Sequence, residues 1–285
     1  QAVALLVLCH LGVRIGWRFA HHDRHLAQAG PPRRTTALCA VVNVVVPGHV
    51  TRTHDQRLQD AVLADAARFK RERLGDQLKG KSIALVFFNP SMRTRTSFEL
   101  GAFQLGGHAV VLSPGKDAWP IEFDLGTVMD GDTEEHIAEV AKVLSRYVDL
   151  IGVRAFPKFV DWASDREDKV LKGFAKYATV PVINMETITH PCQELAHALA
   201  LQEHFGTTDL RGRKYVLTWT YHPKALNTAV ANSALTIATR MGMDVTLLCP
   251  TPDYLLDERY MGWAERNIAE NGGSLDEAQL ARLAS

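Results

Sequence analysis

Residue types that could hold a phosphate gather in one short stretch, Ser91 to Thr96, directly after a hydrophobic run, Ile83 to Phe88. Asn89-Pro90 separates the two runs, and an amphipathic segment follows. This order predicts a buried strand, a turn and the start of a helix. Backbone N–H groups, three hydroxyls and two guanidiniums would then converge at the positive end of a helix dipole, where a phosphate is favoured. The alternative is an ordinary capped helix with solvated arginines.

A second polar string, His190-Pro191-Cys192-Gln193, follows the predicted strand Val180 to Asn184 and opens another helical pattern. The string Ser91-Met92-Arg93-Thr94-Arg95 resembles the carbamoyl phosphate loop of the aspartate/ornithine carbamoyltransferases. The second string resembles the His-Pro-Cys-Gln motif of their ornithine-type branch. Two motifs in the right order, each at a strand-to-helix junction, are more specific than either alone. The flanking sequence, roughly residues 55 to 274, is most similar to the branch that acts on N-acetylornithine.

The resemblance implies carbamoyl transfer from carbamoyl phosphate to the side-chain amine of N-acetyl-L-ornithine. N-acetylcitrulline and phosphate are the products, in arginine biosynthesis, and neither a metal nor another cofactor is required. The residues that the resemblance assigns to carbamoyl phosphate are Ser91, Met92, Arg93, Thr94, Trp119, Arg154, His190 and Gln193.

Within that set, Arg154 and His190 are the implied catalytic residues, which would polarise the carbonyl oxygen as it gains negative charge. Glu186 and Asn227 are the implied acetylornithine contacts. From the residues alone, other readings stay open. Arg154 could form a strand-end salt bridge, Trp119 could pack in a surface loop, and Glu186 could stabilise a helix N-terminus.

Four other functions are weighed against this one. A catalytically inactive remnant would bind carbamoyl phosphate or dock on intact subunits, and ornithine or succinylornithine could replace the acetylated substrate. Gly75 to Ser82 matches the P-loop pattern of nucleotide hydrolases, but it follows a helical pattern and precedes a strand, the reverse of the required order. A dehydrogenase is disfavoured because the GxGxxG fingerprint is absent.

The expected fold is α/β, with the parallel-sheet, two-domain architecture of the carbamoyltransferases. Residues 1–54 are expected to be an extension outside the family, 55–205 the carbamoyl phosphate domain, and 206–285 an incomplete amino-acid domain. A helix is predicted from Glu134 to Tyr147, capped by Asp132 or Thr133, and another at the C-terminal end, Leu275 to Ser285. The resemblance implies a homotrimer.

Composition excludes several classes of protein. Lys plus Arg and Asp plus Glu are equal at 32 each, so no net field favours nucleic acid. Four scattered cysteines argue against a disulfide framework and suit a reducing compartment, which predicts a cytoplasmic location. The apolar run Ala2 to Cys9 is too short to span a bilayer, so no membrane role is expected. No metal site is predicted, because His190, His197 and His204 lack a carboxylate or thiolate framework.

Overall fold

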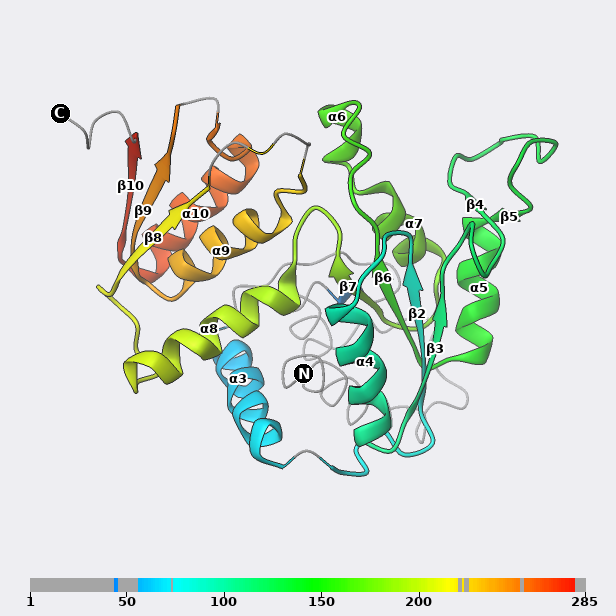
Figure 1. Ribbon diagram of the computed structural model, residues 1–285, viewed down its shortest axis with the longest axis horizontal. Coiled ribbons are helices and arrows are strands. Elements are labelled where there is room, and N and C mark those ends of the chain that lie inside the picture. The colour runs from blue at the N-terminus through cyan, green and yellow to red at the C-terminus, as the bar shows by residue number, and fades with distance from the viewer. Residues whose placement is uncertain are drawn as a thin grey trace, which may run out of the picture. The chain divides into compact units, whose positions relative to one another are not determined.

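The chain folds as two compact units, divided between Thr187 and Ile188. The structure, a computed structural model, describes residues 44–45, 56–72, 74–219, 222, 226–251 and 254–279 (Figure 1). Of the predicted extension, residues 1–54, only strand β1 (Val44–Val45) lies within the described residues. The predicted domain boundary between residues 205 and 206 stays a prediction.

The first unit is built on a five-stranded sheet in the order β1-β7-β6-β2-β3. Its parallel strands are β2 (Ser82–Phe87), β3 (His108–Leu112), β6 (Leu150–Arg154) and β7 (Val182–Glu186), and β1 pairs antiparallel with β7. Every residue of β6 and β7 is buried, as expected for parallel strands covered on both faces. The predicted α/β class is therefore confirmed.

The order of these strands creates a switch point between β2 and β6. From β2 the chain proceeds to β3 on one side, and it then returns to β6 on the other side. In open α/β sheets, ligands bind at the carboxyl ends of the strands that flank such a point. The segment after β2 is the one that carries Ser91 to Thr94, and β6 ends at Arg154.

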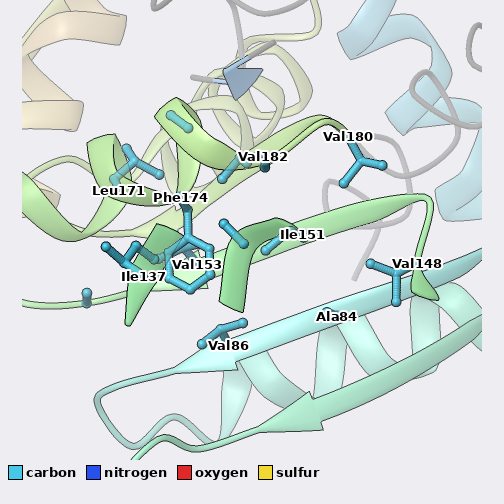
Figure 2. Packing of buried hydrophobic residues seen from close by; sticks show 14 residues of the cluster. Ala84, Val86, Ile137, Val148, Ile151, Val153, Leu171, Phe174, Val180 and Val182 are labelled. Atoms are coloured by element: carbon cyan, nitrogen blue, oxygen red, sulfur yellow. The ribbon is translucent and has the colours of Figure 1, made fainter. Parts of the chain in front are cut away.

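Two helices that pack on one another, α5 (Ile137–Tyr147) and α7 (Lys169–Tyr177), supply much of the core of the first unit (Figure 1). Figure 2 shows Phe174 and Ile137 packed beside Val153, and all three are at most 1% exposed. Burying an aromatic or aliphatic side chain of this size stabilises a fold by about 1.5–3 kcal/mol. The other helices described in this unit are α3 (Gln56–Arg71), α4 (Arg93–Gln104) and α6 (Trp162–Asp165).

Helix α5 begins later than its sequence pattern predicted. Residues Glu135–His136 form the short strand β5, which pairs in parallel with β4 (Ile121–Glu122). The ring Nδ1 of His136 then accepts a hydrogen bond from the N–H of Ala138, at 3.2 Å, and caps the helix. The predicted cap at Asp132 or Thr133 was wrong, because strand pairing with a distant segment overrides the local capping signal.

The second unit is a three-stranded parallel sheet, in the order β10-β9-β8, with helices packed on it and on one another. Among the helices that the structure describes, none is long and apolar enough to cross a membrane. The described elements of the second unit are α8 (Pro191–Phe205), β8 (Lys214–Thr218), α9 (Ala229–Arg240), β9 (Asp244–Cys249), α10 (Glu258–Asn271) and β10 (Ser274–Gln279).

The helix predicted from Leu275 to Ser285 was wrong for residues 275–279, which lie in strand β10, and residues 280–285 lie outside the described residues. Residues Ser274 to Gln279 pair in register with Asp244 to Cys249 of β9. A helical residue pattern is a weak preference, and pairing with the backbone groups along one side of β9 overrides it. This segment therefore provides the third strand of the sheet.

Candidate active site

Arg154 and Glu186 form a buried ion pair at the carboxyl ends of neighbouring strands. Nη1 of Arg154 donates to Oε2 of Glu186, and each side chain is only 10% exposed. The pairing of β6 with β7 shifts register after Val153, so Arg154 lies opposite Glu186 and not opposite Met185. Irregularities of this kind re-aim side chains beside functional sites. The predicted strand ended at Asn184, whereas β7 extends two residues further and Glu186 is its last residue.

The electrostatics of this pair follow from its burial. Burial raises the pKa of the Glu186 carboxyl, while the nearby guanidiniums of Arg154 and Arg93 act in the opposite direction. The Arg154 guanidinium also lies over the ring of Phe156, with its carbon 4.5 Å from the ring centroid. Its Nε is buried and has no hydrogen-bond partner among the described residues. A fixed, desolvated cation with an unused donor is suited to binding an oxyanion.

The phosphate-type loop reaches the same place from β2. The Oγ of Ser91 accepts a hydrogen bond from the N–H of Thr94, at 3.1 Å, across the first turn of α4. The Oγ1 of Thr94 lies 3.5 Å from Nη1 of Arg154. The side chain of Met92 is 82% exposed, which leaves its backbone as the group that could bind a ligand here. Ser91, Thr94, Arg154 and Glu186 therefore form one connected cluster.

Only one of the two loop guanidiniums acts on this cluster. Arg93 lies close enough to lower the pKa of Glu186. Arg95 instead lies 3.6 Å from the carboxylate of Glu99, one helical turn further along α4. The predicted convergence of both guanidiniums was therefore wrong for Arg95, because a partner four residues away on the same helix pairs with it.

Asn89 supports the site, a role that its position in the sequence does not indicate. Its Oδ1 accepts a hydrogen bond of 2.6 Å from the N–H of Phe156. The N–H of Phe88 donates to the carbonyl of Arg154, at 2.9 Å. These two bonds tie the segment after β2 to the segment after β6. An Asn-Pro pair after a buried strand is a recognisable turn signal, but nothing in the sequence identifies its partner.

Trp119 lies in the loop after β3, where it is 63% exposed. Together with Lys116 and Glu135 it lines a cavity of about 610 Å³ within the first unit. Ser91, Thr94 and Arg154 are not among the described residues that line this cavity. Within one chain, Trp119 therefore lines a different pocket surface from the phosphate-type loop and Arg154.

His190, Gln193 and Asn227 belong to the second unit. His190 occupies the N-cap position of α8, with Pro191 at the first helical position, and Gln193 lies in the first turn. The Oδ1 of Asn227 accepts a hydrogen bond from the N–H of Ala229 at the start of α9, at 3.1 Å. Burial raises the pKa of the Cys192 thiol to about 12. Cys192 therefore remains protonated at neutral pH, which disfavours it as a nucleophile.

Two other sites considered from the sequence find no support. The P-loop match, Gly75 to Ser82, follows α3, includes turn residues and runs directly into β2. A P-loop must follow a strand and precede a helix, so the order is reversed. Within the described residues, no group of three His, Cys, Asp or Glu side chains is placed to hold a metal ion.

Comparison with known proteins identifies the family. A family model described as aspartate/ornithine carbamoyltransferase, carbamoyl-P binding domain, matches residues 49–203 of the 285-residue chain. The chain belongs to this carbamoyltransferase family. The matched range contains the loop Ser91 to Thr94, Arg154, Glu186 and the string His190 to Gln193.

Individual carbamoyltransferases are similar at high identity. The N-acetylornithine carbamoyltransferase of Xanthomonas campestris pv. campestris is 88% identical over 216 residues, which cover 76% of this chain and 64% of that protein. The enzyme of the same name from Xylella fastidiosa (strain Temecula1) is 76% identical over 228 residues, covering 79% and 68%. The chain thus spans about two thirds of the length of these relatives.

A solved structure gives the same picture of the fold. The crystal structure of an acetylornithine transcarbamylase in complex with acetylcitrulline superimposes with a TM-score of 0.78 at 84% sequence identity. The match covers 79% of this chain and 67% of that one. The predicted carbamoyltransferase fold is therefore confirmed.

Proposed function

We propose that this chain transfers the carbamoyl group of carbamoyl phosphate to the side-chain amine of N-acetyl-L-ornithine, in arginine biosynthesis. The observation that carries the proposal is the cluster of Ser91, Thr94 and Arg154 at the switch point of a parallel sheet. The 88% identity to an N-acetylornithine carbamoyltransferase supports the choice of amine substrate.

Carbamoyl phosphate binds through its phosphate at the start of α4. The hydroxyls of Ser91 and Thr94, the backbone of Met92 and the guanidinium of Arg93 hold the phosphate oxygens, and the helix dipole favours its charge. Arg154 contributes Nε, the buried donor without a partner among the described residues, to the carbonyl oxygen. The carbonyl carbon becomes tetrahedral during attack, so a donor aimed at its oxygen stabilises the transition state more than the ground state.

The remaining groups are His190, Gln193 and Asn227 of the second unit, and Glu186 at the end of β7. His190 donates to the carbonyl oxygen together with Arg154, and the side-chain oxygen of Gln193 accepts from the carbamoyl NH2. Asn227 and Glu186 contact acetylornithine. Only three residues separate Glu186 from His190 along the chain, so residues of both substrates' sites lie on one short segment.

The protein accelerates the reaction by positioning the two substrates and by stabilising the negative charge that develops on the carbonyl oxygen. The attacking amine has a free pKa of about 10, so it must lose a proton on binding, which a basic site favours. The amine nitrogen then forms a bond to the carbonyl carbon. The C–O bond to the phosphate breaks, the phosphate leaves with its electrons, and the departing phosphate takes the second proton of the amine nitrogen. A single well-placed oxyanion donor typically contributes about 3 kcal/mol to such a step.

The active assembly is proposed to be a cytoplasmic homotrimer. Trp119 is 63% exposed within its own chain, and the nearby loop residues Leu125 and Val128 are 65% and 72% exposed. Large apolar side chains at such exposure mark contact surfaces when they gather on one segment. Trp119 would then reach the carbamoyl phosphate site of a neighbouring subunit.

The deciding experiment is a citrulline-forming assay on the 285-residue chain, with carbamoyl phosphate and N-acetylornithine, ornithine or succinylornithine. Turnover that is fastest with the acetylated amine supports the proposal. Faster turnover with another amine would change the substrate. Binding of carbamoyl phosphate in calorimetry without turnover would favour the non-catalytic alternative, and absence of both would refute the assignment.

A pair of loop variants provides a matched control. Arg93→Ala should lower turnover by about 100-fold, which corresponds to the loss of about 3 kcal/mol of transition-state stabilisation. Arg95→Ala removes the same charge two residues away, but Arg95 pairs with Glu99, so turnover should change less than about twofold. Equal losses in the two variants would indicate a general charge effect and not a specific phosphate contact.

A further inference from the structure

Helix α9 carries polar side chains in the interior of the second unit. Asn232, Ser233, Thr236 and Thr239 are each at most 2% exposed. Buried polar groups of this kind need hydrogen-bond partners, because an unpaired one costs free energy. The identity of those partners shows what each residue does.

Two of these side chains hold the backbone that leads into α8. The Oγ of Ser233 accepts a hydrogen bond of 2.8 Å from the N–H of His190. The Nδ2 of Asn232 donates to the carbonyl of Ile188, at 2.9 Å. Thr189 lies between these anchors, so the chain is fixed on both sides of it.

The other two polar side chains have different partners. The hydroxyl of Thr236 donates to the carbonyl of Asn232 on its own helix, at 2.8 Å. Thr239 donates to the carbonyl of Leu235 and accepts from Nδ2 of Asn267 on α10. These contacts stabilise the helix pair and do not involve the segment before α8.

The anchor at Ser233 acts on a residue that is already restricted on its other side. Pro191 follows His190 and disfavours the helical backbone conformation for it. His190 accordingly has φ −128° and ψ 70°. With its N–H held by Ser233 and its carbonyl side held by Pro191, the direction in which its side chain leaves the backbone is fixed.

We infer that Ser233, assisted by Asn232, is a positioning residue that orients His190 for carbamoyl transfer. This inference deepens the proposed function and rests on it. At the start of the same helix, Asn227, the proposed acetylornithine contact, accepts a hydrogen bond from the N–H of Ala229. Helix α9 therefore connects the amine-binding loop at its start with the backbone of His190.

The test compares Ser233→Ala with Thr236→Val, a matched variant that also removes one buried hydroxyl of α9. The first measurement is hydrogen exchange of the backbone amides in residues 187–193. Ser233→Ala should lose protection at His190, whereas Thr236→Val should exchange like the wild type. Unchanged protection in Ser233→Ala would overturn the inference.

Turnover and affinity are measured on the same variants. Ser233→Ala should lower kcat by about 10- to 100-fold, since small misplacements of a catalytic group reduce rate on this scale. The KM for carbamoyl phosphate should change less than threefold, and Thr236→Val should retain wild-type kcat. Equal loss of kcat in the two variants would show a merely structural role and overturn the inference.

A second substitution keeps the test decisive if Ser233→Ala does not fold. Ser233→Cys retains a weaker acceptor and should give an intermediate kcat, and a value equal to wild type would contradict the inference. Absence of turnover in the wild type itself would refute the proposed function, and the inference with it. Turnover in the wild type with no selective effect at Ser233 would refute the inference alone.

Discussion

Replacing Arg154 by methionine should destabilise the first unit through the charge that it leaves behind. The side chains of Arg154 and Glu186 are each only 10% exposed, so water cannot replace the lost partner. Removing one member of a buried pair typically costs about 3–5 kcal/mol in the free energy of unfolding. Methionine is unbranched and flexible, so it fills most of the space of the arginine stem and limits the contribution of a cavity.

The pH dependence of this loss separates charge from packing. Burial raises the pKa of Glu186 and Arg154 opposes that rise, so Arg154→Met should raise the pKa further. A carboxyl whose pKa is raised in the folded state destabilises the fold as pH rises from its unfolded pKa, about 4.3, to its folded pKa. Each added pKa unit corresponds to about 1.4 kcal/mol. The loss should therefore be larger at pH 8 than at pH 5.

Urea unfolding of four proteins at pH 5 and pH 8, followed by circular dichroism, measures this effect. The proteins are the wild type, Arg154→Met, Glu186→Gln and the double variant. At pH 8 the double variant should recover about 2 kcal/mol relative to Arg154→Met, because the unpaired buried charge is gone. The same loss at pH 5 and pH 8, without recovery in the double variant, would refute the electrostatic explanation.

Three further predictions concern single positions. Burial raises the pKa of Asp168 to about 6, so stability should fall as pH rises from about 4 to 6, by at most about 3 kcal/mol; Asp168→Asn should remove this dependence in thermal unfolding followed from pH 4 to 7. Gly152→Ala places a Cβ 2.9 Å from Sδ of Met185, and chemical denaturation should show a loss of about 1–3 kcal/mol; no loss would mean that Met185 moves freely. Ser91→Ala removes the acceptor for the N–H of Thr94, and should cost about 1 kcal/mol in stability and weaken carbamoyl phosphate binding in calorimetry; unchanged affinity would argue against a phosphate contact.

The strand–turn–helix around Ser91 could be predicted because its signals are local. A continuous hydrophobic run, an Asn-Pro turn and hydroxyl residues before an amphipathic segment lie within a few residues of one another, and β2 and α4 followed. Arg154, which the sequence pattern places at a strand end, is the last residue of β6. The carbamoyltransferase fold was identified from the two motifs, not from these periodicities.

Two of the predictions that failed depend on strand pairing with another segment of the chain. Strand β10 forms because its backbone pairs with that of β9. The residues from Leu275 to Gln279 carry no strand pattern of their own. The pairing of β5 with β4 likewise delays the start of α5 to Ile137. Arg95 could not be separated from Arg93 by residue type, since only the direction of each side chain around α4 decides which one acts on Glu186.

The effect of Glu186 on the choice between ornithine and acetylornithine depends on its ion pair as well as on its position. A carboxylate near the amine site would favour ornithine, whose α-ammonium is charged, over acetylornithine, in which that nitrogen is an uncharged amide. In this fold, however, Glu186 is buried and paired with Arg154, so much of its charge is already balanced. A carboxylate that is already paired with a guanidinium gains little from a ligand ammonium. Its interaction with the ligand therefore weakens less when the ligand lacks that charge. Glu186→Gln should therefore reduce turnover mainly by loosening Arg154, with similar losses for both amines, and a selective gain for ornithine or for acetylornithine in the citrulline assay would contradict this reasoning.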